Sequence, residues 1–126
     1  MSQTLKRTLI QSIRLMDYDF MCLHNSVQGV GEAEISRIET LGLSIERLRS
    51  ILEEIPAREY ADRGRMHDIR TQLSIVSTRT QLLNFKCKEK LGSTSISYLG
   101  KILAECENIN RWLETHRDPE GAGVYT

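Results

Sequence analysis

The sequence is poor in proline and in aromatic residues, as is typical of small helical proteins. It contains only two prolines, and aromatic residues make up 6% of it, whereas leucine, isoleucine, arginine and glutamate are frequent. This composition favours helices. Lysine and arginine together number 17, as do aspartate and glutamate, so no net charge draws the chain to nucleic acid or to a membrane surface. The 126 residues are a single-domain length.

Long apolar runs are also missing from the sequence. No segment approaches the roughly 20 apolar residues that span a bilayer. The N-terminus lacks the apolar segment and small-residue cleavage site of a secretory signal. Because arginines are spread along the chain and aromatics are few, we expect no nucleic-acid partner. These absences predict a cytoplasmic protein without a membrane association.

The cysteines are too few and too scattered for a disulfide framework. Cys22, Cys87 and Cys106 are odd in number and have no CxxC spacing, which favours a reduced protein with buried thiols. Cys22 and His24 have no further partners at metal-ligand spacing. We therefore expect neither a metal site nor a cofactor.

Apolar residues recur every three or four positions, which is the spacing of amphipathic helices. They predict a first helix over about residues 3–28, a glycine-containing break, and then a heptad seam over 38–55. Pro56 should kink the helix or start a new one. The same seven-residue register nevertheless resumes at Met66. We therefore interpret residues 38–87 as one long helix, kinked or interrupted near Pro56.

A last helix with its own apolar seam is expected over about 96–113, so residues 57–116 predict an antiparallel hairpin of two long helices. One hairpin with a single apolar stripe per helix cannot cover its own core. It must pair with a second copy, or with the N-terminal helices, to complete a four-helix bundle. We expect an all-α fold in which the hairpin forms this bundle by dimerisation, preceded by an N-terminal helix over 1–31 and a heptad helix over 32–56. A flexible tail should follow over 117–126.

The middle of the sequence, GRMHDIRTQLSIV, places a polar cluster beside the apolar seam. If Met66 and Ile69 occupy the buried heptad positions, His67 and Thr71 point to solvent on one face of the helix. Asp68 then lies about 100° around the helix axis from His67. An exposed imidazole offers a ring nitrogen lone pair for attack on a phosphoryl group. A lone exposed histidine on a helix is, however, usually an ordinary surface residue.

Residues 67–73, HDIRTQL, resemble the phosphoacceptor box of sensor histidine kinases, H-[E/D]-[aliphatic]-[R/K/N]-[T/N]-P-L, at six of its seven positions. Residues 97–114 are similar to the second helix of the same family's dimerisation and histidine-phosphotransfer (DHp) domain. The resemblance covers roughly residues 57–116. The heptad helix over 35–55 also resembles the signalling helix that often enters such domains.

The resemblance implies a role for each residue of the box. His67 would be phosphorylated, Asp68 would be the acid/base that orients it, and Thr71 would position water when a partner aspartyl phosphate is hydrolysed. The partner would be the receiver domain of a response regulator, with a histidine kinase as a further candidate. The other residues expected to contact a partner are Arg63, Arg65, Arg70 and Gln72.

Two departures from the family pattern bear on the activity. Gln72 stands where the family has a proline that bends the first helix, which leaves the helix straighter and puts conformational switching in doubt. No asparagine-rich box or glycine-rich lid of an ATP-binding domain follows the hairpin, so we expect no autonomous phosphorylation from ATP. We expect a homodimeric histidine phosphotransfer protein of a phosphorelay. The alternatives are a response-regulator phosphatase or sequestering regulator, a non-catalytic helical interaction module, and a kinase fragment.

Overall fold

Four long helices and one short one make up the part of the chain that the structure describes. The computed structural model describes residues 2–27, 29–60 and 62–115, and within these ranges there is no strand. The all-α class expected from the composition is therefore confirmed, whereas the tail expected over 117–126 lies outside the described residues. The helices are α1 Ser2–Ser26, α2 Glu32–Glu54, the 3₁₀ helix η1 Ala57–Glu59, α3 Arg63–Lys86 and α4 Ser93–Thr115.

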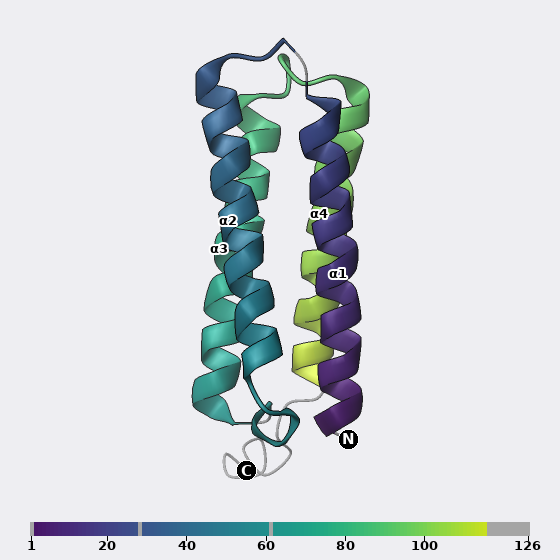
Figure 1. Cartoon of the computed structure of the whole chain (residues 1–126), viewed down its shortest axis with the longest axis vertical. Coiled ribbons are helices and arrows are strands. Elements are labelled where there is room, and N and C mark those ends of the chain that lie inside the picture. The colour runs from purple at the N-terminus through teal and green to yellow at the C-terminus, as the bar shows by residue number, and fades with distance from the viewer. Residues whose placement is uncertain (1, 28, 61, 116–126) are drawn as a thin grey trace.

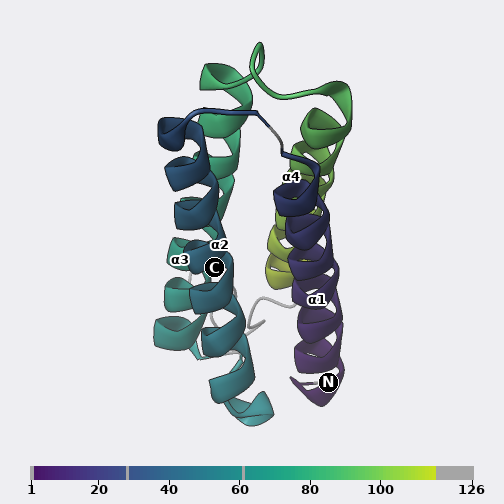
Figure 2. The same ribbon diagram turned by 45° about the horizontal axis from the view of Figure 1, so that its top comes forward.

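The four long helices stand side by side and run alternately in opposite directions (Figures 1 and 2). Each helix packs against the next one in the chain, and α4 packs against α1, which closes the ring. The four-helix bundle is thus complete within one chain. The apolar side of the α3–α4 hairpin is covered by α1 and α2, which is one of the two ways in which such a hairpin can bury its core.

The heptad positions of the sequence form the core of the bundle. Every seam residue of α2 from Ile38 to Leu52 is buried, and so is every seam residue of α3 from Met66 to Leu83. The α3 seam includes Thr80, whose buried hydroxyl donates a hydrogen bond to a backbone carbonyl one turn earlier at 2.7 Å. Because that hydrogen bond satisfies the hydroxyl within its own helix, a polar side chain is accommodated in an apolar layer.

The interruption expected near Pro56 is confirmed, but the chain reverses its direction there, so the interpretation of residues 38–87 as one long helix is wrong. Helices α2 and α3 are separate and pack against each other in antiparallel orientation. Proline has no N–H to donate and disfavours helical geometry in the residue before it. Ile55 accordingly has extended backbone angles, φ −71° and ψ 123°. Glu59 ends the short helix η1 in this corner, and Asp62 is the N-cap of α3.

Contacts from α1 hold the corner in place. The Lys6 ammonium donates hydrogen bonds to the carbonyl oxygens of Glu53 and Ile55, at 3.0 and 2.8 Å. These carbonyls belong to the C-terminal end of α2, where the last helical turn leaves acceptors without partners and a cation is favourable. Tyr60 is fully buried, and its hydroxyl donates to the Leu52 carbonyl. The corner therefore fixes where α3 begins relative to α2.

Candidate functional site

His67 lies in the second turn of α3, next to this corner. The Asp62 side chain accepts a hydrogen bond from the Arg65 backbone N–H at 3.1 Å, which is the standard arrangement of a helix N-cap. Met66 is buried, while His67 and Thr71 are exposed one turn apart. The expected heptad register is therefore confirmed, and both side chains lie on the solvent face of α3.

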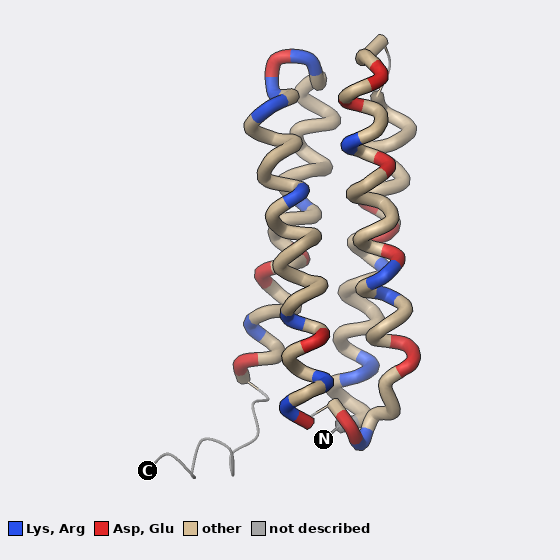
Figure 3. The backbone as a smooth tube through the Cα atoms, turned by 90° about the vertical axis from the view of Figure 1, so that its left-hand side faces the viewer, with Lys and Arg blue, Asp and Glu red and all other residues tan. Residues whose placement is uncertain are grey.

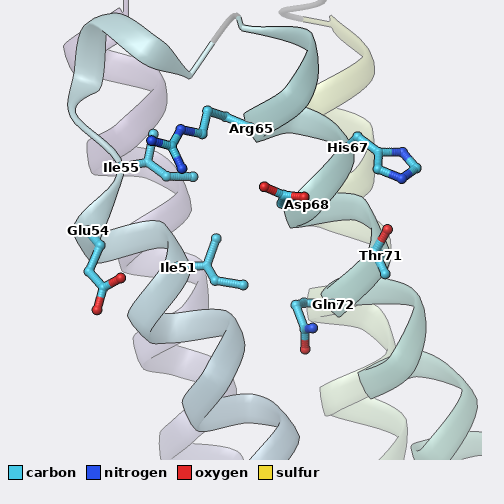
Figure 4. A pocket seen from close by; sticks show the side chains of 8 residues that line it. All are labelled: Ile51, Glu54, Ile55, Arg65, His67, Asp68, Thr71 and Gln72. Carbon is cyan, nitrogen blue, oxygen red and sulfur yellow. The ribbon is translucent and has the colours of Figure 1, made fainter.

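A groove with a volume of about 530 Å³ runs between α2 and the first turns of α3. Figure 4 shows Arg65 and Asp68 extending from α3 toward α2, where Ile51 and Ile55 lie opposite them. His67 points away from α2, at the other side of α3 (Figure 4). The residues that line the groove are Ile51, Glu54, Ile55, Arg65, His67, Asp68, Thr71 and Gln72.

The two polar neighbours of His67 differ in how they relate to it. Thr71 is exposed on the same face of α3, where its hydroxyl can reach a group held by the imidazole. Asp68 is turned toward α2, and among the described residues no hydrogen bond joins its carboxylate to His67. In this geometry the orientation of the exposed imidazole is set by its own helix position and not by a hydrogen bond to Asp68.

The arginines expected at the site divide between the two flanks of α3. Arg65 lies on the α2 side, where its Nε donates to the Glu59 carboxylate at 3.3 Å. Arg70 lies on the α4 side and is half-buried. Arg63, the first residue of α3, is exposed. Arginines therefore lie on both flanks of α3 near His67, with the Glu59 and Asp68 carboxylates beside the one on the α2 side. Along the bundle as a whole, Lys, Arg, Asp and Glu are interspersed (Figure 3).

Gln72, which stands where the resembling family has proline, is half-buried in the α2–α3 groove. Its Oε1 is shielded from solvent and has no hydrogen-bond partner among the described residues. Helix α3 continues without a break from Arg63 to Lys86. The straighter helix expected from the missing proline is consistent with this uninterrupted hydrogen-bond ladder.

No cysteine lines the groove between α2 and α3. Cys87 and Cys106 are buried and Cys22 is half-buried, and all three are free thiols. Burial and the neighbouring Glu105 carboxylate raise the pKa of the Cys106 thiol to about 12, which keeps it protonated and unreactive. Across the described part of the chain, no group of three or more His, Cys, Asp or Glu side chains could hold a metal ion.

Sequence reasoning missed the contribution of α2 to the site. Ile51 and Ile55 form the wall opposite Asp68, but the continuous-helix interpretation placed them along the axis of α3 and not beside it. The signal that could have found them is Pro56, eleven residues before His67. A reversal at Pro56 places the last turns of α2 beside the first turns of α3.

Comparisons with known proteins give no relative for this chain. No family model matches the sequence, and neither a curated protein nor a solved structure matches it. Over the described ranges, no helix has an apolar stretch of the length needed to cross a membrane. The function must therefore be argued from the chemistry of the site.

Proposed function

We propose that the protein is a histidine phosphotransfer protein in which His67 accepts a phosphoryl group and exchanges it with the aspartate of a response-regulator receiver domain. The observation that carries the proposal is the placement of His67. It is exposed on a rigid helix, it has no hydrogen-bond partner among the described residues, and arginines border it on both flanks. An unpaired imidazole can attack phosphorus, and guanidinium groups stabilise the phosphoryl oxygens.

The neighbouring residues take roles that follow from their positions. The Thr71 hydroxyl, one turn from His67 on the same face, is suited to bind a phosphoryl oxygen or a water molecule. Asp68 borders the groove and would reach the ring N–H of His67 after a side-chain rotation, which would fix the imidazole tautomer. A receiver domain, or a histidine kinase acting as donor, would approach the exposed side of α3. We propose that this phosphoryl exchange takes place in the cytoplasm.

The homodimer implied by the family resemblance has to be formed differently here. The apolar faces of α3 and α4 are already covered by α1 and α2. A second copy would therefore associate through the outer surface of a finished bundle, and phosphotransfer does not require it. Measuring the mass in solution at several protein concentrations tests this part of the proposal.

The direct test is the mass of the protein from its own cells. It should be purified at neutral to basic pH, and its intact mass should be compared before and after brief acid treatment, because phosphohistidine is acid-labile. We expect an acid-labile phosphoryl group that is lost in His67→Ala and kept in His24→Ala, which removes another exposed histidine, on α1. Absence of the group while relay partners are active would contradict the proposal.

One observation favours a second candidate, a response-regulator phosphatase. Asp68 and Gln72 lie one turn apart and both line the groove, and the shielded Oε1 of Gln72 can accept a hydrogen bond from a water molecule. Such a water could attack an aspartyl phosphate of a docked receiver domain. The test uses a receiver domain phosphorylated by acetyl phosphate. If the protein is a phosphatase, the His67→Ala variant should still accelerate hydrolysis of the aspartyl phosphate, whereas the Gln72→Ala variant should not. Phosphotransfer predicts that His67→Ala abolishes the exchange and that Thr71→Ala preserves it.

A further inference from the structure

Arg70 has hydrogen-bond donors that the described residues leave unused. Its Nε and Nη2 atoms are shielded from solvent, and neither has a hydrogen-bond partner among the described residues. Burying a charged group without hydrogen-bond partners is energetically unfavourable. A guanidinium stays charged at every physiological pH, so Arg70 cannot remove this penalty by losing a proton. Buried donors in folded proteins are nearly always paired. The unpaired donors leave Arg70 with hydrogen-bonding capacity for an acceptor from outside the bundle.

Arg70 lines a groove between α3 and α4 with a volume of about 260 Å³. Around Arg70 the groove presents the hydroxyls of Ser74 and Ser77 and the side-chain amide of Asn110, all of which can donate hydrogen bonds. Glu107 is the carboxylate that borders it, and within the described ranges it forms no ion pair with Arg70. The full lining is Arg70, Leu73, Ser74, Ser77, Cys106, Glu107 and Asn110.

This groove adjoins the proposed phosphoacceptor. Arg70 and Ser74 also line a shallow hollow on the outward face of α3 that includes His67 and Thr71. Residues three and seven positions apart on a helix lie on neighbouring or shared faces, so Arg70 and Ser74 stand beside His67 in the direction of α4. A group bound in the groove would thus be held at the side of the imidazole that faces away from α2.

We propose that the α3–α4 groove is a binding site for a tetrahedral oxyanion, of the phosphate class, with Arg70 as its main ligand. After a side-chain rotation that turns Nε and Nη2 into the groove, the Arg70 guanidinium would donate from these two atoms to two oxygens, which is the bidentate geometry that arginine forms with phosphate. Ser74 and Asn110 complete the set of donors. The biological meaning of the site rests on the proposed function, since the oxyanion would be the phosphoryl group entering or leaving His67.

The first test uses inorganic phosphate as the probe and records amide chemical shifts of the whole chain by NMR. Saturable shifts should centre on residues 70, 74, 77 and 110. Arg70→Met should weaken phosphate binding about tenfold or more, the effect of losing a charge-assisted hydrogen bond, whereas Arg47→Met, at an exposed position of α2, should leave it unchanged. Glu107→Gln should tighten binding, because it removes the carboxylate at the border. Shifts that are absent, or equal in Arg70→Met and the parent protein, would overturn the inference.

The second test asks whether the site serves His67, with phosphoramidate as the phosphoryl donor. A ring nitrogen attacks phosphorus, the phosphorus–nitrogen bond of the reagent breaks, and ammonia leaves with the bonding electron pair. His67 should be phosphorylated faster than the exposed His24, and Arg70→Met should slow His67 about tenfold without affecting His24. Equal rates at both histidines in the parent protein would contradict a role of the groove in phosphoryl transfer.

The two proposals fail separately in these experiments. Phosphate binding that survives in His67→Ala supports the anion site whether or not the native protein carries phosphohistidine. If the native protein carries phosphohistidine but binds no phosphate, the proposed function stands and the oxyanion site in the α3–α4 groove is refuted.

Discussion

The packing of α1 on α2 can be tested at a pair of glycines that occupy helix interiors in opposite surroundings. Gly42 lies in the middle of α2, and a Cβ added there would come within 2.6 Å of the outer end of the Phe20 ring on α1. Gly100 lies in the interior of α4 and is exposed, and a Cβ added there would meet nothing within 4 Å. The same substitution at both positions separates helix propensity from packing.

Propensity alone would make both changes stabilising. Replacing glycine by alanine in a helix interior is worth about 0.8–1 kcal/mol, and Gly100→Ala should gain this amount in full. At Gly42 the new methyl group must displace the Phe20 ring from the groove beside α2, and overpacking of this kind costs about 1–3 kcal/mol. Gly42→Ala should therefore lower the free energy of unfolding by about 1 kcal/mol in net terms.

The measurement is urea unfolding of both variants followed by circular dichroism at 222 nm. With an m-value of about 1.5 kcal/mol/M, the two midpoints should differ by about 1 M or more. Phe20→Leu supplies the control, because it removes the atoms that the methyl group meets. In that background Gly42→Ala should become stabilising by about as much as Gly100→Ala. If Gly42→Ala stabilises the protein fully while Phe20 is intact, the close approach of α1 to α2 is refuted.

Three further predictions concern single groups. Tyr60→Phe removes the hydroxyl that donates a hydrogen bond to a buried carbonyl of α2. It should lower the free energy of unfolding by about 1–2 kcal/mol, measured by thermal or urea unfolding. Because burial raises the pKa of the Tyr60 phenol, its absorbance should titrate only as the protein unfolds at high pH. With a thiol-specific disulfide reagent near pH 8, Cys22 should react before Cys106, whose pKa is raised to about 12, and equal rates would show that the α3–α4 interface opens readily. Desolvation and then repulsion from Asp19 raise the pKa of the Glu105 carboxyl. The folded state therefore binds this proton more tightly than the unfolded state, and stability should fall as pH rises from about 4.3 through the raised pKa. Glu105→Gln should raise the unfolding midpoint at pH 7 and flatten its pH dependence, and an unchanged pH profile would contradict the burial of this carboxylate.

The core of the bundle could be predicted from the sequence because the spacing of apolar residues indicates which side of each helix is buried. The seam residues of α2 and α3 are buried as their spacing predicts. Periodicity carries no information about the direction of the chain, however. A helix that continues past Pro56 and a helix that turns back satisfy the same seven-residue count. The reversal was decided by the proline and by the contacts of Lys6 and Tyr60, which come from distant or irregular parts of the chain.

The candidate site was predictable to the same extent and for the same reason. The exposure of His67 and Thr71 follows from the register of their own helix. What neighbouring helices bring to the site does not follow from it. Ile51 reaches the groove only because α2 turns back along α3, and the shielding of the Arg70 donors depends on how closely α4 packs. Neither the residue spacing nor the composition of α3 determines how α2 and α4 pack against it.

The closure of the bundle within one chain has a consequence for the proposed phosphotransfer. In a bundle made from two identical hairpins, each phosphoacceptor is repeated on the opposite side by symmetry. Here α2 occupies one flank of α3 and presents Ile51 and Ile55, while α4 occupies the other and presents Asn110 beside Arg70. The two flanks of His67 therefore differ in chemistry. The groove on the α2 side combines two isoleucines with polar side chains such as Asp68 and Gln72, and the proposed oxyanion site lies on the α4 side. If the proposed phosphotransfer takes place, a receiver domain would meet His67 with its phosphoryl group on the α4 side and the groove of Ile51 and Ile55 on the α2 side.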